Sequence, residues 1–154
     1  MKDFKSLKLD VGDKIPTLEL SEISRSSLAL YSEASGDNNP IHTDIDFAKE
    51  SGLPDVIAHG MLIMSYLARA LTNTFSHQSL TDFSSKFISM TQINDRLLCS
   101  GKVISKEKDS NKNTILKVSL SVVNQNGEKR ITGRAIVKIK PQNFDEQRIG
   151  KYAI

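Results

Sequence analysis

The chain has 154 residues, of which 38% are hydrophobic and 25% charged, so we expect a single globular domain over residues 1–154 rather than a disordered chain. No apolar run reaches the roughly 18 residues needed to cross a bilayer, and the N-terminal MKDFKSLKLD lacks the apolar core of a signal peptide. With one cysteine, Cys99, an internal disulfide is excluded, and the sequence favours a cytoplasmic protein.

The net charge of +3 is unevenly distributed along the chain. Residues 82–154 carry 14 Lys and Arg against 7 Asp and Glu, a net +7. This surplus indicates either a solvated face of strand lysines or a surface that attracts phosphate or an acidic carrier protein. Basic residues do not alternate with aromatic ones, so we expect no nucleic-acid binding.

Helices are predicted in the first half of the chain. Ser24 is a suitable N-cap for a helix over 25–35, which Gly36 would end. The GDNNP segment, 36–40, is a dense turn signal, and Asp44 could cap a second, short helix through Ser51.

The segment 59–73, HGMLIMSYLARALTN, is the most informative for the fold. Arg69 is its one charged residue after the opening His-Gly, and the other positions are almost all apolar. A helix of roughly 15 residues would be about 22 Å long, too short to span a membrane. We therefore expect a helix buried on all sides by the rest of the chain.

The rest of the chain is predicted to be strands. The clearest has Leu116, Val118 and Leu120 alternating with polar residues, and Asn126-Gly127 predicts a hairpin. The expected strands are 17–20, 83–91, 97–106, 114–124 and 129–140, followed by a polar tail after about residue 141. These patterns predict an α+β fold in which a helix packs on a sheet.

The first candidate site is the pair Asp37 and His42. Pro40 makes a continuous helix between them improbable, and a tight turn through 36–40 could aim both side chains at one point. A carboxylate beside an imidazole is a common acid–base pair. The alternative is that Asp37 is only a turn residue and His42 only begins a helix.

Around this pair the chain reads SGDNNPIHTDIDFA (35–48) and IAHGML (57–62), and it also contains VGDKIP (11–16) and GEKRITGRAIV (127–137). In the first two segments strongly, and in the last two more weakly, the sequence resembles the MaoC-like family, which includes (R)-specific enoyl-CoA hydratases and (3R)-hydroxyacyl-ACP dehydratases. The resemblance implies the hotdog fold, a curled antiparallel sheet wrapped around one long buried helix. One departure is Asn94-Asp95, where family members often have Gly-Asp; Asn tolerates the same left-handed turn.

The resemblance also implies residue roles. Asp37 and His42 would be catalytic, and Asn39 would help to fix them and a water. Gly60 would offer its backbone N–H to the thioester carbonyl, and a helix N-terminus does supply such donors. Ser65 is a further candidate for substrate binding, with a small packing residue as the alternative.

The remaining histidines receive no chemical role from the sequence. We interpret His59 as a structural N-cap and His77 as a surface residue. His42, His59, His77 and Cys99 are not spaced like a known ligand cluster, so we expect no metal site, and the resemblance implies no cofactor.

The expected reaction is hydration of a trans-2-enoyl thioester, or dehydration of a 3-hydroxyacyl thioester, carried on CoA or acyl-carrier protein. The resemblance implies the R stereoisomer and a homodimer. One rival is a hotdog thioesterase, although such enzymes commonly place a carboxylate on the buried helix and 59–73 has none. Another is the catalytic subunit of a heteromeric dehydratase.

Overall fold

The computed structural model describes residues 8–141, so the tail predicted after residue 141 lies outside the described residues. Within this range the strands are β1 (Leu18–Glu22), β2 (Leu80–Phe87), β3 (Arg96–Lys108), β4 (Thr114–Val123) and β5 (Lys129–Ile139). The helices are α2 (Arg25–Ser35), α3 (Ile45–Glu50) and α4 (Gly60–Thr74), with short 3-10 turns η1 (Pro40–His42) and η2 (His77–Ser79).

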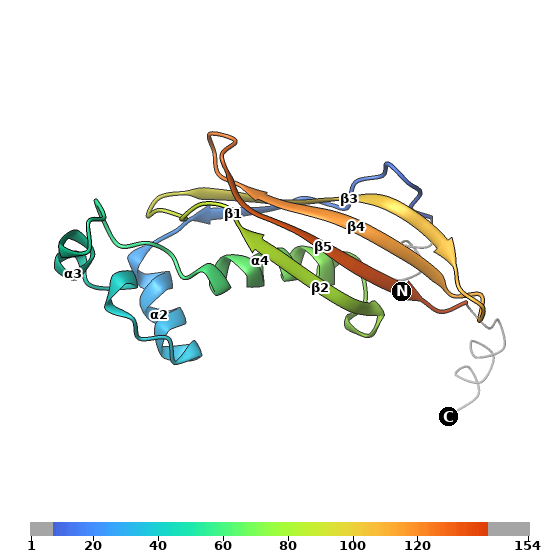
Figure 1. Cartoon of the computed structure of the whole chain (residues 1–154), viewed down its shortest axis with the longest axis horizontal. Coiled ribbons are helices and arrows are strands. Elements are labelled where there is room, and N and C mark those ends of the chain that lie inside the picture. Colours follow the sequence, from blue (N-terminus) through green and yellow to red (C-terminus); the bar gives the residue numbers. More distant parts are fainter. Residues whose placement is uncertain (1–7, 142–154) are drawn as a thin grey trace, which may run out of the picture.

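The strands form one antiparallel sheet in the order β1-β3-β4-β5-β2, so β1 and β2 are its edges. The sheet arches over one side of α4, while α2 and α3 lie beyond the end where α4 begins (Figure 1). This is the predicted α+β arrangement of a sheet curled over a helix.

Alternation along β4 explains why one face of the sheet packs on α4. Leu116, Val118, Leu120 and Val122 are buried, whereas Lys117 and the other odd-numbered positions are more exposed. A fully buried Leu or Val side chain stabilises a fold by about 1.5–3 kcal/mol relative to exposure. The period of two therefore fixes which side of the strand faces the helix.

The helix α4 is less enclosed than the sequence predicted. Leu62, Ile63, Leu67, Ala70 and Leu71 are buried, but Met61, Ser65, Arg69 and Asn73 are exposed. The four exposed residues recur every four positions and so form one stripe along the helix. Three of them are polar, and this narrow polar stripe allows one side of α4 to face outward, contrary to the expectation of burial on all sides.

The helix boundaries before α4 follow the predicted signals. The Ser24 hydroxyl accepts the Ser27 N–H at the start of α2, and Gly36 ends that helix in the left-handed region at φ 76°. Asp44 accepts two backbone N–H groups at the start of α3, as a capping carboxylate should. The 36–42 segment is thus held between two well-defined helix ends.

The strand β2 ends earlier than the predicted limit of residue 91. The N–H of Ile88 donates to the Arg130 carbonyl at 2.9 Å, and that carbonyl also lies 3.4 Å from the Ser89 nitrogen. Two successive amides that converge on one carbonyl cannot continue a ladder. The apolar residues after Phe87 consequently leave the sheet.

Among the described residues, we find no helix with the length and apolarity that a membrane crossing requires.

Candidate active site

The turn between α2 and α3 is built by its own polar side chains. The Asn39 side chain accepts the Ile41 N–H at 3.1 Å and caps η1, in which Pro40 occupies the first turn. The Asn39 N–H in turn donates to the Asp37 carboxylate at 3.3 Å. These local contacts bring Asp37 and His42 to one place, where their side chains also approach His59: one ring nitrogen of each histidine and one carboxylate oxygen of Asp37 lie within 4.8 Å of one another.

His42 is oriented by the main chain. Its Nδ1 lies 2.7 Å from the carbonyl of Ile57, and since a carbonyl only accepts, Nδ1 carries the proton. In the neutral ring the Nε2 atom then keeps a lone pair, which can accept a proton or a water hydrogen. The side chain is half-buried and lines a pocket, so the ring has access to a ligand.

A pocket of about 380 Å³ lies against His42 and the start of α4. Its wall is mainly apolar, with Ile63, Phe87, Ile88 and Met90 among the lining residues. Such a wall accommodates an acyl chain better than a polar molecule, because apolar surface is removed from water on binding.

Gly60 is both the first residue of α4 and part of the pocket wall. The side chain of His59, at the N-cap, does not accept from the first amides of the helix. A helix start without a side-chain cap presents backbone N–H donors and a partial positive charge to a ligand. A Cβ at Gly60 would lie 3.0 Å from the Phe87 ring, so glycine keeps this part of the wall open.

The structure separates the predicted site residues into two groups. His42 and Gly60 line the pocket. Asp37 is exposed and is not among the lining residues, but it lies beside His42 and His59, and Asn39 shapes the turn that carries it. Ser65 lies on the exposed stripe of α4, where its hydroxyl donates to the Leu62 carbonyl at 2.7 Å. It is not among the residues that line the pocket, so its role in substrate binding stays a prediction.

His59 occupies the N-cap position that the sequence predicted, but its contact with His42 was not predicted. It is only 1% exposed, and its ring stacks on that of His42 with centroids 3.8 Å apart and planes 27° from parallel. Burial lowers the pKa of His59 below its usual value, so the ring is neutral at neutral pH. The one signal in the sequence was its position directly before the helix-opening glycine.

The cluster of Asp37, His42 and His59 has enough ligand atoms for a metal ion, but its geometry suits acid–base chemistry better. The lone pairs of two stacked rings lie in two separate, nearly parallel planes, so they are poorly placed to bind one shared ion. In addition, Nε2 of His59 already lies 3.1 Å from the Asp37 carbonyl.

Comparison with known proteins identifies the family. Residues 8–126 match the model of the MaoC like domain. The chain belongs to the MaoC-like family. The members of this family are hydratases and dehydratases of fatty-acid metabolism, and the hotdog fold inferred from the sequence is confirmed.

Three similar proteins illustrate the relationship. The chain is 31% identical over 104 residues to the mitochondrial 3-hydroxyacyl-[acyl-carrier-protein] dehydratase of Arabidopsis thaliana, covering 68% of this chain and 61% of that protein. It is 31% identical over 143 residues to fatty acid synthase subunit beta of Saccharomyces cerevisiae, covering 90% of this chain and 6% of that protein. The solved (R)-hydratase of A. caviae involved in PHA biosynthesis superposes with a TM-score of 0.73 at 25% identity, covering 86% of this chain and 98% of that one. The MaoC-like chain thus spans less than two thirds of these two curated relatives.

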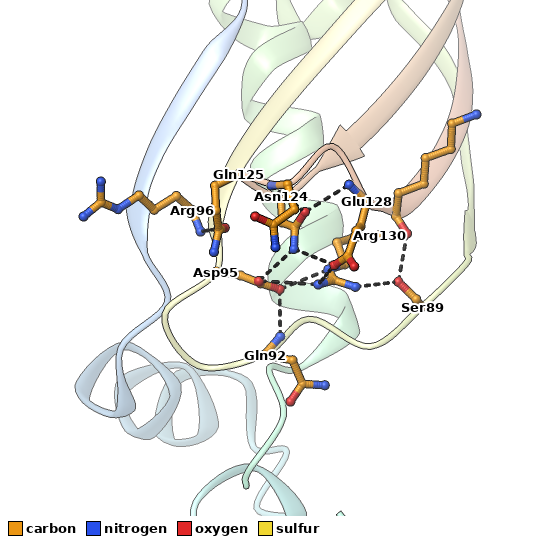
Figure 2. A network of polar contacts seen from close by, with 10 residues as sticks. Ser89, Gln92, Asp95, Arg96, Asn124, Gln125, Glu128 and Arg130 are labelled. Carbon is orange, nitrogen blue, oxygen red and sulfur yellow. Dashed lines mark hydrogen bonds and ion pairs between the residues drawn. The ribbon is translucent and has the colours of Figure 1, made fainter. Parts of the chain in front are cut away.

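Behind the pocket wall this MaoC-like domain has a buried polar network that the sequence did not reveal (Figure 2). The Arg130 guanidinium donates to Asp95 at 3.0 Å, and both side chains are more than nine-tenths buried. Asn124 donates to the same carboxylate at 3.1 Å. Arg130 also donates to the Ser89 hydroxyl at 2.9 Å, and Ser89 lines the pocket. The network therefore connects the β4–β5 turn to the pocket wall.

The Asn94-Asp95 departure noted in the sequence fits this network. Asn94 has φ 67°, the left-handed conformation expected for the position where relatives often have Gly. The turn places Asp95 so that its carboxylate accepts the Gln92 N–H at 2.9 Å and faces Arg130 (Figure 2). Asn94 thus adopts the left-handed turn that the sequence predicted for this position.

Proposed function

We propose that this MaoC-like domain hydrates trans-2-enoyl thioesters and, in reverse, dehydrates (R)-3-hydroxyacyl thioesters. The observation that carries the proposal is the meeting of Asp37 and His42 next to an apolar pocket that also contains the first residue of α4. Membership of the family supports the reaction class.

The proposed step uses a water held by the Asp37 carboxylate and the Nε2 lone pair of His42. His42 takes a proton from this water as its oxygen forms a bond to the β-carbon. The electrons of the carbon–carbon double bond move toward the thioester carbonyl, and the N–H of Gly60 stabilises the resulting negative oxygen. The protonated His42 then delivers its proton to the α-carbon and regains its starting state, so the sum of the steps is addition of H and OH without a cofactor.

The first experiment is absorbance-monitored hydration of crotonyl-CoA and of crotonyl-ACP by the wild type, Asp37→Asn and His42→Ala. Each variant should lose at least about 100-fold in kcat/KM, the low end of what positioned acid–base groups contribute. His77→Asn is the matched control, because His77 is exposed on η2 and should leave the rate unchanged. Near wild-type rates in both site variants would refute the mechanism.

A thiol reagent added to the same reactions distinguishes hydration from thioester hydrolysis. A hotdog thioesterase would release free thiol, which a thiol reagent detects without following the double bond. The absence of a carboxylate from α4 speaks against hydrolysis. We expect loss of enoyl absorbance with no thiol released.

The proposed working state is a homodimer. The pocket residues Phe87, Ile88 and Met90 are 50%, 47% and 53% exposed, and β2 is an edge strand of the sheet. Apolar side chains in such a cluster, beside an unpaired strand edge, favour contact with another subunit. Light scattering should give twice the chain mass, and a monomer that is fully active would contradict this part of the proposal.

A further inference from the structure

The ring of His59 is fixed from both sides. His42 stacks on it with centroids 3.8 Å apart, and the edge of Tyr31 approaches it with centroids 5.0 Å apart at 64°. At 1% exposure the ring has no space in which to rotate. The hydrogen bond to the Ile57 carbonyl restrains the His42 ring within the plane of the ring. The stack with His59 restrains movement of the same ring out of that plane.

The same residue holds the main chain of Asp37. Nε2 of His59 lies 3.1 Å from the Asp37 carbonyl oxygen, which the Ser32 hydroxyl also contacts at 2.8 Å. Since the carbonyl only accepts, Nε2 carries the proton of the neutral ring. The backbone from which the Asp37 carboxylate projects is thus fixed by two donors.

The other nitrogen of His59 shows that packing alone does not explain this residue. Nδ1 is buried and has no hydrogen-bond partner among residues 8–141. A buried polar atom without a partner is destabilising, and phenylalanine would fill the same space without one. What phenylalanine could not supply is the N–H that binds Asp37.

We propose that His59 is a positioning residue, whose stacked ring orients His42 and whose Nε2–H orients Asp37. His59 is not among the residues that line the pocket, so it acts through the ring of His42 and the main chain of Asp37 rather than on substrate. The inference rests on the proposed function, in which Asp37 and His42 form the reacting pair.

Three variants separate the two contacts. His59→Phe keeps a flat ring beneath His42 but has no donor, His59→Gln keeps a donor without the ring, and His59→Ala removes both. We expect kcat on a crotonyl thioester to fall about 10- to 100-fold in His59→Ala, with little change in KM, because small misplacements of reacting groups have effects of this size. The Phe and Gln variants should each lie between His59→Ala and the wild type.

Two further measurements decide between positioning and simple packing. Thermal unfolding should show that His59→Phe remains fully folded, and ¹³C relaxation of the His42 ring should show more ring motion in His59→Ala than in the wild type, because the stack no longer restrains the ring. Wild-type kcat in a folded His59→Phe or His59→Ala, or unchanged His42 ring motion in His59→Ala, would overturn the inference. If the wild type itself did not hydrate the thioester, the proposed function would fail, while the NMR result would still decide whether His59 orients His42.

Discussion

The pocket of this MaoC-like domain has two walls that are held together in different ways. On one side, the turn of Asp37 and His42 is built from contacts between residues close in sequence, such as Asn39 with Ile41. On the other side, residues 88–91 are held by Arg130, 41 positions away from its hydrogen-bond partner Ser89. The first wall carries the candidate chemistry, and the second fixes the shape of the space beside it.

The largest effect should come from breaking the second wall at Arg130. Arg130→Met would leave the Asp95 carboxylate buried without its cation, and such a change typically costs about 3–5 kcal/mol of folding free energy. Urea unfolding followed by circular dichroism measures this loss. We expect a lower midpoint for the variant and a poorly formed pocket.

Two comparisons sharpen that test. Arg134→Met changes an exposed arginine on the same strand and should alter stability by no more than about 0.5 kcal/mol. Asp95→Asn combined with Arg130→Met leaves no charge buried and should recover part of the loss. Equal stability of Arg130→Met and Arg134→Met would show that the network does not hold the wall.

The next effect concerns the point where the two walls meet, at Gly60 and Phe87. The Cβ introduced by Gly60→Ala would lie 3.0 Å from the Phe87 ring, which is half exposed and can move aside. We expect stability within about 1 kcal/mol of the wild type, because alanine favours the helix while the ring must shift. Activity should fall about tenfold, since the new methyl group and the displaced ring narrow the space beside the helix amide.

Gly133→Ala is the matched control for that variant. A Cβ there would lie 2.7 Å from the Ser84 carbonyl, a backbone atom that cannot move aside, so the loss should appear in stability. Measuring unfolding and crotonyl-CoA hydration for both variants separates the two outcomes. An unstable but normally active Gly60→Ala would contradict the role assigned to this glycine.

The contrast between the walls also explains what the sequence could predict. The limits of α2, the cap at Asp44 and the hairpin at Asn126-Gly127 are local signals, and the structure confirms all of them. The sequence also indicated that the 36–40 turn could aim Asp37 and His42 at one point, and the structure places them together. Their catalytic role was implied by the family resemblance and stays a proposal.

What the sequence did not predict depends on contacts between distant segments. The pairing of Asp95 with Arg130 crosses 35 positions, and an alternating strand pattern treats such an arginine as a surface residue. His59 was placed correctly at the start of α4, but its stack with His42 depends on how the 36–42 turn packs on that helix. The exposed stripe of α4 was not predicted, because the prediction rested on the number of apolar residues in 59–73. The spacing of the polar residues, one at every fourth position from Ser65 to Asn73, was not considered.

A smaller effect is expected at Asn94, which positions Asp95 for the second wall. At φ 67° a residue with an ordinary side chain is strained, so Asn94→Ala should cost about 1 kcal/mol. Asn94→Gly should be close to neutral, because glycine adopts this conformation without strain. Chemical denaturation of the two variants checks the difference, and equal losses would show that the side chain of Asn94, not its backbone, is what matters.

The smallest effect concerns the first wall and depends on pH. Burial lowers the pKa of His59 from its ordinary value of 6.5, so as the pH falls through that value the unfolded chain takes up a proton that the folded chain resists. The free energy of unfolding of the wild type is therefore unaffected by this group above about pH 7.5, and it decreases as the pH falls from there toward about 5.5. His59→Phe has no such group, so the stability difference between it and the wild type should shift in favour of the variant as the solution becomes more acidic. Urea midpoints of both proteins across this range provide the measurement, and parallel curves would mean that the His59 ring accepts a proton in the folded state as readily as in the unfolded chain.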